Sequence, residues 1–106
     1  MARRRVQVEE AIAHHAGDFL AREISVKALI TVTRAIMTDD LKQATIFLSV
    51  LPENMEAETM KFAKRSRSDL REYIKKHSAL HPIPVVDFQL DLGEKNRQRI
   101  DDLTRS

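Results

Sequence analysis

The stretch from Leu29 to Leu51, LITVTRAIMTDDLKQATIFLSVL, decides the fold. Its two ends, Leu29–Thr38 and Ala44–Leu51, are rich in β-branched and apolar residues, a composition typical of strands. The polar TDDLKQ segment that joins them is typical of a turn. We therefore expect an antiparallel pair of strands.

The residues that follow this pair are expected to form a long helix and a third strand. Pro52 ends the second strand, because a proline nitrogen donates no ladder hydrogen bond. Asn54 is expected to cap a helix that runs from about residue 54 to His77. Two prolines then favour extended backbone before Val85–Leu92, VVDFQLDL, in which apolar and polar residues alternate as in a half-buried strand.

The segment before the strand pair has the pattern of an amphipathic helix. From Arg4 to Glu23, apolar residues recur every three or four positions. These positions are Val8, Ala11, Ile12, His15 or Ala16, Phe19 and Leu20. Gly17 lowers helix stability by about 1 kcal/mol relative to Ala, so we expect it to mark a close approach of a neighbouring backbone.

Together these elements predict an α+β domain in which helices pack on one face of a three-stranded sheet. We expect a single domain over residues 1–106, because a chain of this length can bury one core but not two. Residues 1–5 are expected to be a basic N-terminal arm, and residues 93–106 a polar C-terminal tail. In that tail, Ile100 and Leu103 allow one short docked turn.

The composition indicates a soluble cytoplasmic protein. A content of 42% hydrophobic and 32% charged residues allows a core to form but is too charged for a membrane span. The chain has no cysteine, which excludes disulfides, a thiolate nucleophile and Cys-containing zinc sites. The N-terminal arginines are not followed by the apolar run of an export signal.

The helix expected to end at His77 carries a strongly basic face. From Lys61 to His77 there are seven Lys or Arg against two acids, a charge of 7 − 2 = +5, which leaves 2 − 5 = −3 for the rest of the chain. In helical projection the basic residues gather opposite the apolar side. They are Lys61, Lys64, Arg65, Arg67, Arg71, Lys75 and Lys76. Because like charges one turn apart repel each other, such a face is typical of a protein that binds a polyanion such as RNA or DNA.

The sequence contains few residues that could form a catalytic or metal site. His77 and His81 have the spacing of a metal pair, but Pro82 follows at once and no third ligand is near, so no metal site is expected. Asp39 and Asp40 could hold a catalytic cation, yet aspartates in a turn usually cap or face solvent. We therefore expect no enzyme, no cofactor and no small-molecule substrate.

The aromatic residues Phe47, Tyr73 and Phe88 could in principle form a platform on which RNA bases stack. No aromatic RNA-binding motif accompanies them. We expect all three in the core.

Several blocks of the sequence resemble the ribosome-binding factor A family. They are Val32–Arg34, Thr38–Ala44, Ile46–Leu51, Ser68–Arg71, Pro84–Phe88 and Arg99–Leu103. The resemblance implies a type II KH-like fold, in which a kink, commonly Ala-x-Gly, interrupts the second helical region. Ser66, Arg67 and Ser68 occupy that place here, and Ser25-Val26-Lys27 stands where the family has Asp-Pro after the first helix.

The resemblance also implies a bacterial factor that binds the small (30S) ribosomal subunit and its 16S rRNA, assists rRNA processing and maturation, and supports growth in the cold. We expect a monomer in which Lys64, Arg67, Arg71 and Lys75 contact phosphates. Arg3, Arg4 and Arg5 would reach the same RNA as a mobile arm. A bend at Ser66 would divide the basic face between two helical arms, so the RNA would be held around a corner.

Two other functions stay open. The basic face could bind an acidic protein, which would make the domain a protein-interaction module. The chain could also be a general RNA-binding KH-like protein without preference for the ribosome. A nuclease that uses Asp39 and Asp40 is disfavoured, because no convergent pocket or ligand cluster can be assembled from the sequence.

Overall fold

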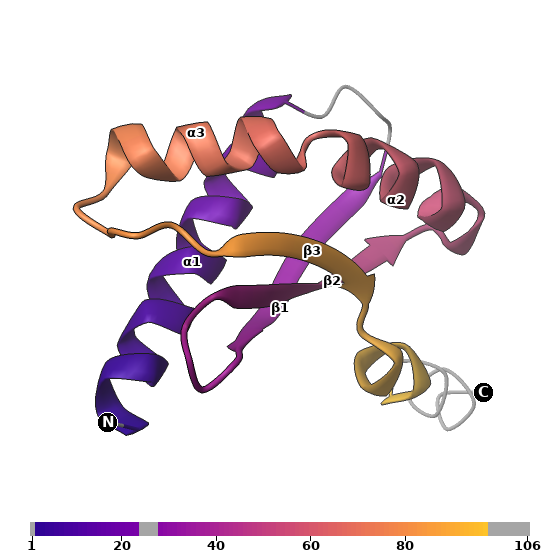
Figure 1. The fold of residues 1–106 in the computed structure, drawn as a ribbon. Helices are drawn as coiled ribbons and strands as arrows, with labels where there is room; N and C mark the ends of the chain where they lie inside the picture. Colours follow the sequence, from indigo (N-terminus) through magenta and orange to yellow (C-terminus); the bar gives the residue numbers. More distant parts are fainter. Residues whose placement is uncertain (1, 24–27, 98–106) are drawn as a thin grey trace.

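The computed structural model describes residues 2–23 and 28–97. Its elements are α1 (Ala2–Glu23), β1 (Leu29–Met37), β2 (Gln43–Leu51), the 3-10 turn η1 (Glu53–Met55), α2 (Glu56–Arg65), α3 (Arg67–His77) and β3 (Val85–Leu90). Residues 92–97 are again helical. The strands form one sheet in the order β1-β2-β3, with β1 antiparallel to β2 and β3 parallel to β2 (Figure 1). The predicted α+β class and the antiparallel pair are confirmed.

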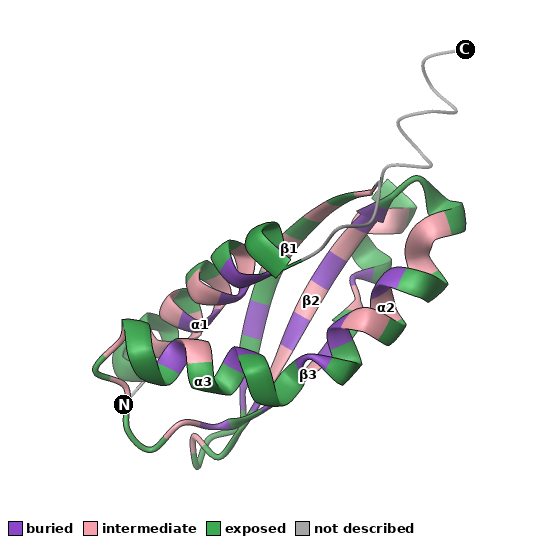
Figure 2. Cartoon of the chain, turned by 90° about the horizontal axis from the view of Figure 1, so that it is seen from above, coloured by how far each residue is buried: buried purple, intermediate pink, exposed green. Residues whose placement is uncertain are grey.

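Three helices cover the same face of the sheet. α1 lies beside α3, and α2 continues from α3 over the other end of the strands (Figures 1 and 2). The buried core joins the apolar side of α1 to the inward-facing residues of β2 and β3. Its largest fully buried side chains include Ile12, Ile46, Leu48, Leu70 and Phe88. The predicted apolar face of the first helix is confirmed, with Ala16 rather than His15 in the core.

A bulge in β1 changes which residues face the helices. The register passes from Val32 opposite Leu48 to Arg34 opposite Phe47, so Thr33 is an extra residue in the strand. Even-numbered residues of β1 therefore turn toward the helices before the bulge, and odd-numbered residues after it. As a result Arg34 and Phe47 meet on the uncovered face of the sheet, where the Arg34 guanidinium lies 4.6 Å from the centre of the Phe47 ring.

The third strand ends at Leu90, two residues earlier than expected, because Asp91 caps a helix. Its Oδ1 accepts a hydrogen bond of 3.0 Å from the N–H of Glu94, the geometry of an aspartate at a helix N-cap. The expected polar tail from Gly93 therefore starts with a helix over residues 92–97. The Ile100 and Leu103 positions lie outside the described residues, as does the Ser25-Val26-Lys27 segment.

Three local expectations differ from the structure. Residues 2–5 are the first turn of α1 rather than an arm before it, and arginine is a good helix former. Asn54 does not cap α2, because the chain after Pro52 first winds into η1, and the residue before α2 makes no side-chain capping bond. Gly17 marks no close backbone approach, since a Cβ there would lie 4.0 Å from Cγ2 of Val32, an ordinary contact.

Candidate nucleic-acid interface

The basic residues of α2 and α3 lie on the outer side of these helices. Ala63, Ser66, Leu70 and Ile74 are buried toward the sheet, as the helical projection predicted, whereas Tyr73 is half-buried. All seven Lys and Arg residues between positions 61 and 76 are exposed. Figure 2 shows the resulting division, with exposed positions along the outer side of both helices and buried positions beneath.

The helix is interrupted at Ser66, within the segment where the break was expected. Ser66 has φ −93° and ψ 7°, a conformation that any L residue can adopt, so no glycine is needed there. Its hydroxyl donates to the carbonyl of Phe62 at 2.9 Å, a back-bond to the preceding turn that often bends helices. Arg67 and Ser68 begin α3. The two helices lie end to end across one side of the sheet (Figure 1).

Two of the expected phosphate-binding residues share an internal anion. Lys64 Nζ and Arg67 Nη1 lie 3.3 Å and 3.2 Å from Oδ1 of Asp87, in the edge strand β3. Partial burial alone would raise the pKa of Asp87. The Phe88 N–H and Lys64 Nζ donate to its carboxylate, however, and with the Arg67 charge they hold the pKa below its ordinary value. Asp87 is therefore an anion at neutral pH, held against two cations of the basic face.

Arg71 is held by backbone carbonyls instead of a carboxylate. Its Nε donates to the carbonyl of Pro84 at 3.1 Å, and its Nη2 to that of Ile83 at 3.2 Å. The guanidinium keeps its full charge in this arrangement, since carbonyls are neutral acceptors. Arg71 thus fixes the segment before β3 to α3 and adds positive potential to the surface.

Four cations of the face have unengaged side chains. Lys61, Arg65, Lys75 and Lys76 form no ion pair or side-chain hydrogen bond with any residue of ranges 2–23 and 28–97. They come from both helices, so the free charge extends along the whole face. Within the described residues, their charges are therefore not balanced by an acidic side chain.

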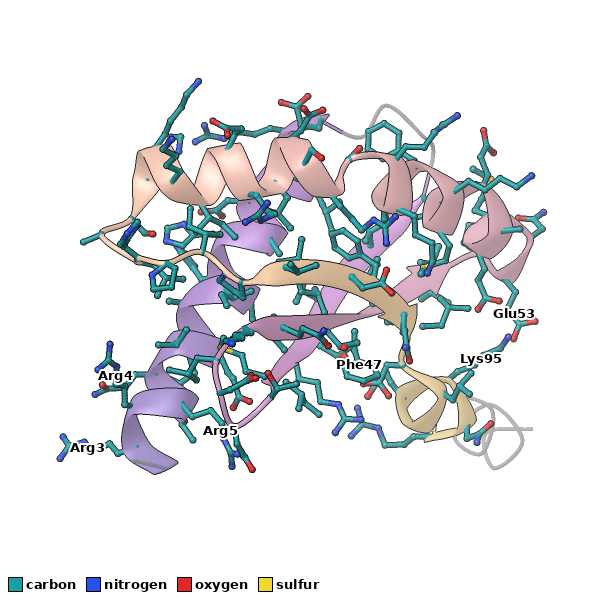
Figure 3. The ribbon with its side chains drawn as sticks, viewed as in Figure 1. Arg3, Arg4, Arg5, Phe47, Glu53 and Lys95 are labelled. Carbon is teal, nitrogen blue, oxygen red and sulfur yellow. The ribbon has the colours of Figure 1, made fainter. Side chains whose placement is uncertain are left out.

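The N-terminal arginines are presented by α1. In Figure 3, Arg3 and Arg4 project outward from its first turn, while Arg5 turns toward the β1–β2 turn and pairs with Asp39. Arg4 lines a cavity together with Leu80 and the residues after it. The start of α1 therefore adds exposed arginines, and Arg4 lies near the loop that follows α3.

His77 and Asp40, which were considered as metal or cation ligands, instead make contacts with neighbouring residues. His77 stacks on Tyr73 with ring centres 4.0 Å apart, and within the described part of the chain no group of three or more metal-ligating residues is present. Asp40 accepts from the Thr38 hydroxyl and the Lys42 N–H, and these bonds, led by the hydroxyl, hold its pKa below the usual value. Across residues 2–23 and 28–97, every helix is too short or too polar to cross a bilayer.

The aromatic residues divide among three environments. Phe88 is fully buried, as predicted, and Tyr73 packs at the edge of the core against Phe19. The expectation for Phe47 was wrong. Its ring projects from the face of the sheet opposite α2 and α3 (Figure 3), because its neighbours in β2, Ile46 and Leu48, take the inward positions.

Solved structures share this fold at low sequence identity. The crystal structure of ribosome-binding factor A from Thermus thermophilus superposes with a TM-score of 0.73 and 13% identity, over 81% of this chain and 93% of that one. A homology model of the Thermus thermophilus factor, fitted into the cryo-EM map of its complex with the 30S subunit, gives a TM-score of 0.63 and 17% identity, over 81% and 89%. At these identities the likeness shows the fold alone.

Sequence comparison shows the family. The protein from Gemmatimonas aurantiaca named ribosome-binding factor A is 30% identical over 105 residues, 95% of this chain and 72% of that protein. The protein of the same name from Coxiella burnetii is 28% identical over 102 residues, covering 94% and 86%. The family pattern described as ribosome-binding factor A matches residues 4–104. This chain belongs to the ribosome-binding factor A family.

Proposed function

We propose that this protein is a cytoplasmic, monomeric factor that binds 16S rRNA in the small ribosomal subunit and assists its maturation. The observation that carries the proposal is the exposed basic face of α2 and α3, in a member of a family of ribosome-binding factors. In support, the Thermus thermophilus factor has been fitted into the map of a complex with the 30S subunit. We include rRNA processing and growth in the cold in the proposed role.

Six of the seven cations of the basic face divide into two groups with different tasks, and Arg71 is held by backbone carbonyls. Lys61, Arg65, Lys75 and Lys76 make the first contacts with phosphates, because none has to leave a partner among residues 2–23 and 28–97. Lys64 and Arg67 follow by exchanging Asp87 for a phosphate, so their contribution to affinity is smaller than that of free cations. Each phosphate neutralised releases counterions, which makes the affinity depend strongly on salt.

Co-sedimentation with purified small subunits tests the proposal. The variant Lys61→Gln with Lys75→Gln removes one free cation from each helix and changes the net charge by −2. Its matched control, Thr31→Glu with Gln89→Glu, makes the same change of charge at exposed positions on β1 and β3. We expect the first variant to lose affinity and to reduce the slope of log K against log salt by about 2, and the control to bind almost normally.

Equal losses in the two variants would show that only the total charge matters and would contradict the assignment of the face.

Treatment of a cell extract with ribonuclease separates RNA from protein partners. Association that survives the digestion would assign the face to an acidic protein. Unrelated structured RNA that competes as well as small subunits do would reduce the function to general RNA binding.

The part of the proposal that concerns maturation needs a cellular measurement. In a bacterial strain that lacks this protein, we expect slow growth at low temperature and accumulation of precursor 16S rRNA. The Thr31→Glu, Gln89→Glu control should restore both properties, and the Lys61→Gln, Lys75→Gln variant should not. Normal precursor levels in the deletion strain would contradict a role in maturation.

A further inference from the structure

A cavity of about 450 Å³ opens at the end of the molecule where α1 begins. Its walls come from three segments that are far apart in the sequence: the first turns of α1, the β1–β2 turn, and the loop that joins α3 to β3. Figure 3 shows Arg4, one of its lining residues, on the outer side of α1. The cavity is separate from the basic face described above, and none of the roles proposed so far uses it.

The walls are mainly apolar, with a few polar groups. Val8, Leu41, Leu80 and Ile83 contribute aliphatic side chains, and the prolines at positions 82 and 84 add compact apolar rings. The polar and charged lining groups are Arg4, Asp40, Lys42 and His81. An apolar hollow of a few hundred Å³ with a small number of polar groups has the usual character of a site for a small planar ligand.

The cavity adjoins the basic face through the loop after α3. Residues Leu80–Ile83 also line a second, more polar hollow of about 560 Å³, whose other walls combine Arg71 and Lys75 with Asp69 and Glu72. A phosphate chain that follows α3 over Lys75 therefore reaches this loop, and the cavity lies on its other side. Arg4 and Lys42 supply positive charge for the phosphates next to a group that enters the cavity.

We propose that this cavity receives one unstacked nucleobase of the RNA bound on α2 and α3, an inference that rests on the proposed function. Proteins that recognise RNA commonly take bases of single-stranded segments out of the stack and hold them between flat side chains. The His81 imidazole offers such a surface to the face of a base, and the proline rings and aliphatic walls add apolar contact. Arg4 and Lys42 hold its flanking phosphates.

Asp40 selects which base enters. Its Oδ1 accepts hydrogen bonds from the Thr38 hydroxyl and the Lys42 N–H, and the residue lines the cavity. A carboxylate only accepts hydrogen bonds. It therefore favours a base with an exocyclic amino group, such as the N4 amino group of cytosine, over uracil, which presents an oxygen at the same position.

Methyl NMR of the full-length protein with mononucleotides tests this inference without the ribosome. Cytidine 5′-monophosphate should shift the methyl signals of Val8, Leu41, Leu80 and Ile83, while the exposed Leu29 methyls, on the uncovered face of the sheet, serve as the control. Uridine 5′-monophosphate should bind roughly two- to tenfold more weakly, the range expected for the loss of one hydrogen bond. The absence of cavity shifts with cytidine 5′-monophosphate, or equal binding of the two nucleotides, would overturn the proposal.

A pair of isosteric variants examines the role of Asp40. Asp40→Asn retains an oxygen for the turn but presents an amide donor to the cavity, so the preference for cytidine should disappear. Asp39→Asn makes the same change of charge at the neighbouring residue, which pairs with Arg5 and does not line the cavity, so the preference should persist. Persistence of the preference in Asp40→Asn would exclude this carboxylate as the selecting group.

Failure of the nucleobase site can be distinguished from failure of the proposed function by comparing the NMR result with subunit binding. Co-sedimentation of small subunits with the wild-type protein measures that function alone. Subunit binding without cavity shifts would sink only the nucleobase site. Cavity shifts without subunit binding would leave a nucleotide-binding protein and refute the ribosomal role.

Discussion

The hydroxyl of Thr33 donates a hydrogen bond of 2.6 Å to Oδ2 of Asp91, which ties the bulge of β1 to the residue that follows β3. The same carboxylate caps the helix over residues 92–97 through the N–H of Glu94. The pKa of Asp91 is held below its ordinary value, first by the hydrogen bond from the Thr33 hydroxyl and then by that from the Glu94 N–H. One carboxylate thus connects both edge strands and a helix.

Thr33→Val should therefore lower the free energy of unfolding by about 1 kcal/mol at neutral pH, because the Asp91 carboxylate loses its hydroxyl donor. Asp91 stabilises the folded protein above its unfolded pKa of about 3.9, and that contribution is lost as pH falls through the lower folded pKa. The difference between variant and wild type should thus shrink below about pH 4. Urea denaturation at several pH values measures it, with Thr31→Val, at an exposed position of the same strand, as the control.

Asp87→Asn should strengthen RNA binding. The substitution removes the anion that Lys64 and Arg67 share, so both cations become available to phosphates. We expect a several-fold gain in affinity for small subunits at low salt and a steeper dependence on salt, with little loss of stability because the pairs are half-exposed. Unchanged affinity in filter binding over a salt series would show that Lys64 and Arg67 do not reach the RNA.

Gly17→Ala should stabilise the protein. Gly17 lies inside α1, and an added methyl would meet the Val32 side chain at an ordinary contact distance of 4.0 Å. The gain in helix propensity is about 1 kcal/mol, which thermal unfolding can resolve. A destabilised variant would mean that α1 cannot accommodate the methyl against β1. Ala13→Gly in the same helix should shift the stability in the opposite direction.

Stability should fall as the pH is lowered through the ordinary histidine pKa of about 6.5, because of His15. Burial, followed by the charge of His14, lowers the pKa of His15; His77 adds to this effect and Asp18 opposes it. The unfolded chain therefore takes up the proton first, near the ordinary pKa of about 6.5, and folding is weakened as pH falls through this range. His15→Gln should flatten the profile of unfolding free energy, whereas His14→Gln, at an exposed position, should retain most of the slope.

The elements could be predicted from the sequence because their signals are local. Alternation in Val85–Leu90 and helical spacing in α1 and α3 report which side of each element is buried, and the structure has these sides as expected. Ser66 also marked the break correctly, since small residues stand where a related kink would be. The exact ends of the helices and their capping residues were harder to predict. Whether Asn54 caps a helix depends on how the chain turns after Pro52, and that turn is η1.

The residues that form ion pairs with the basic face inside the protein could not be predicted, because they are distant from it in the sequence. Lys64 and Asp87 are 23 residues apart, and only the position of β3 at the edge of the sheet, under the α2–α3 junction, brings them together. Similarly, the carboxylate of Glu9 accepts the N–H of Met37 at 2.7 Å, a contact between α1 and β1 that no periodicity reports. The bulge at Thr33 could not be predicted either, because it depends on the pairing of β1 with β2. It changes which residues of β1 face the helices.

The contacts between α3 and the start of β3 also protect the free edge of the sheet. β3 is an edge strand, and the free edge of a strand can pair with another chain and start aggregation. Here Pro84 precedes the strand, Arg71 occupies the carbonyls of residues 83 and 84, and charged groups cluster around Asp87. Charge and proline are the features that commonly protect such edges. Lys64, Arg67 and Arg71, which we propose as RNA-binding residues, therefore also protect β3 from pairing with a strand of another copy of the protein.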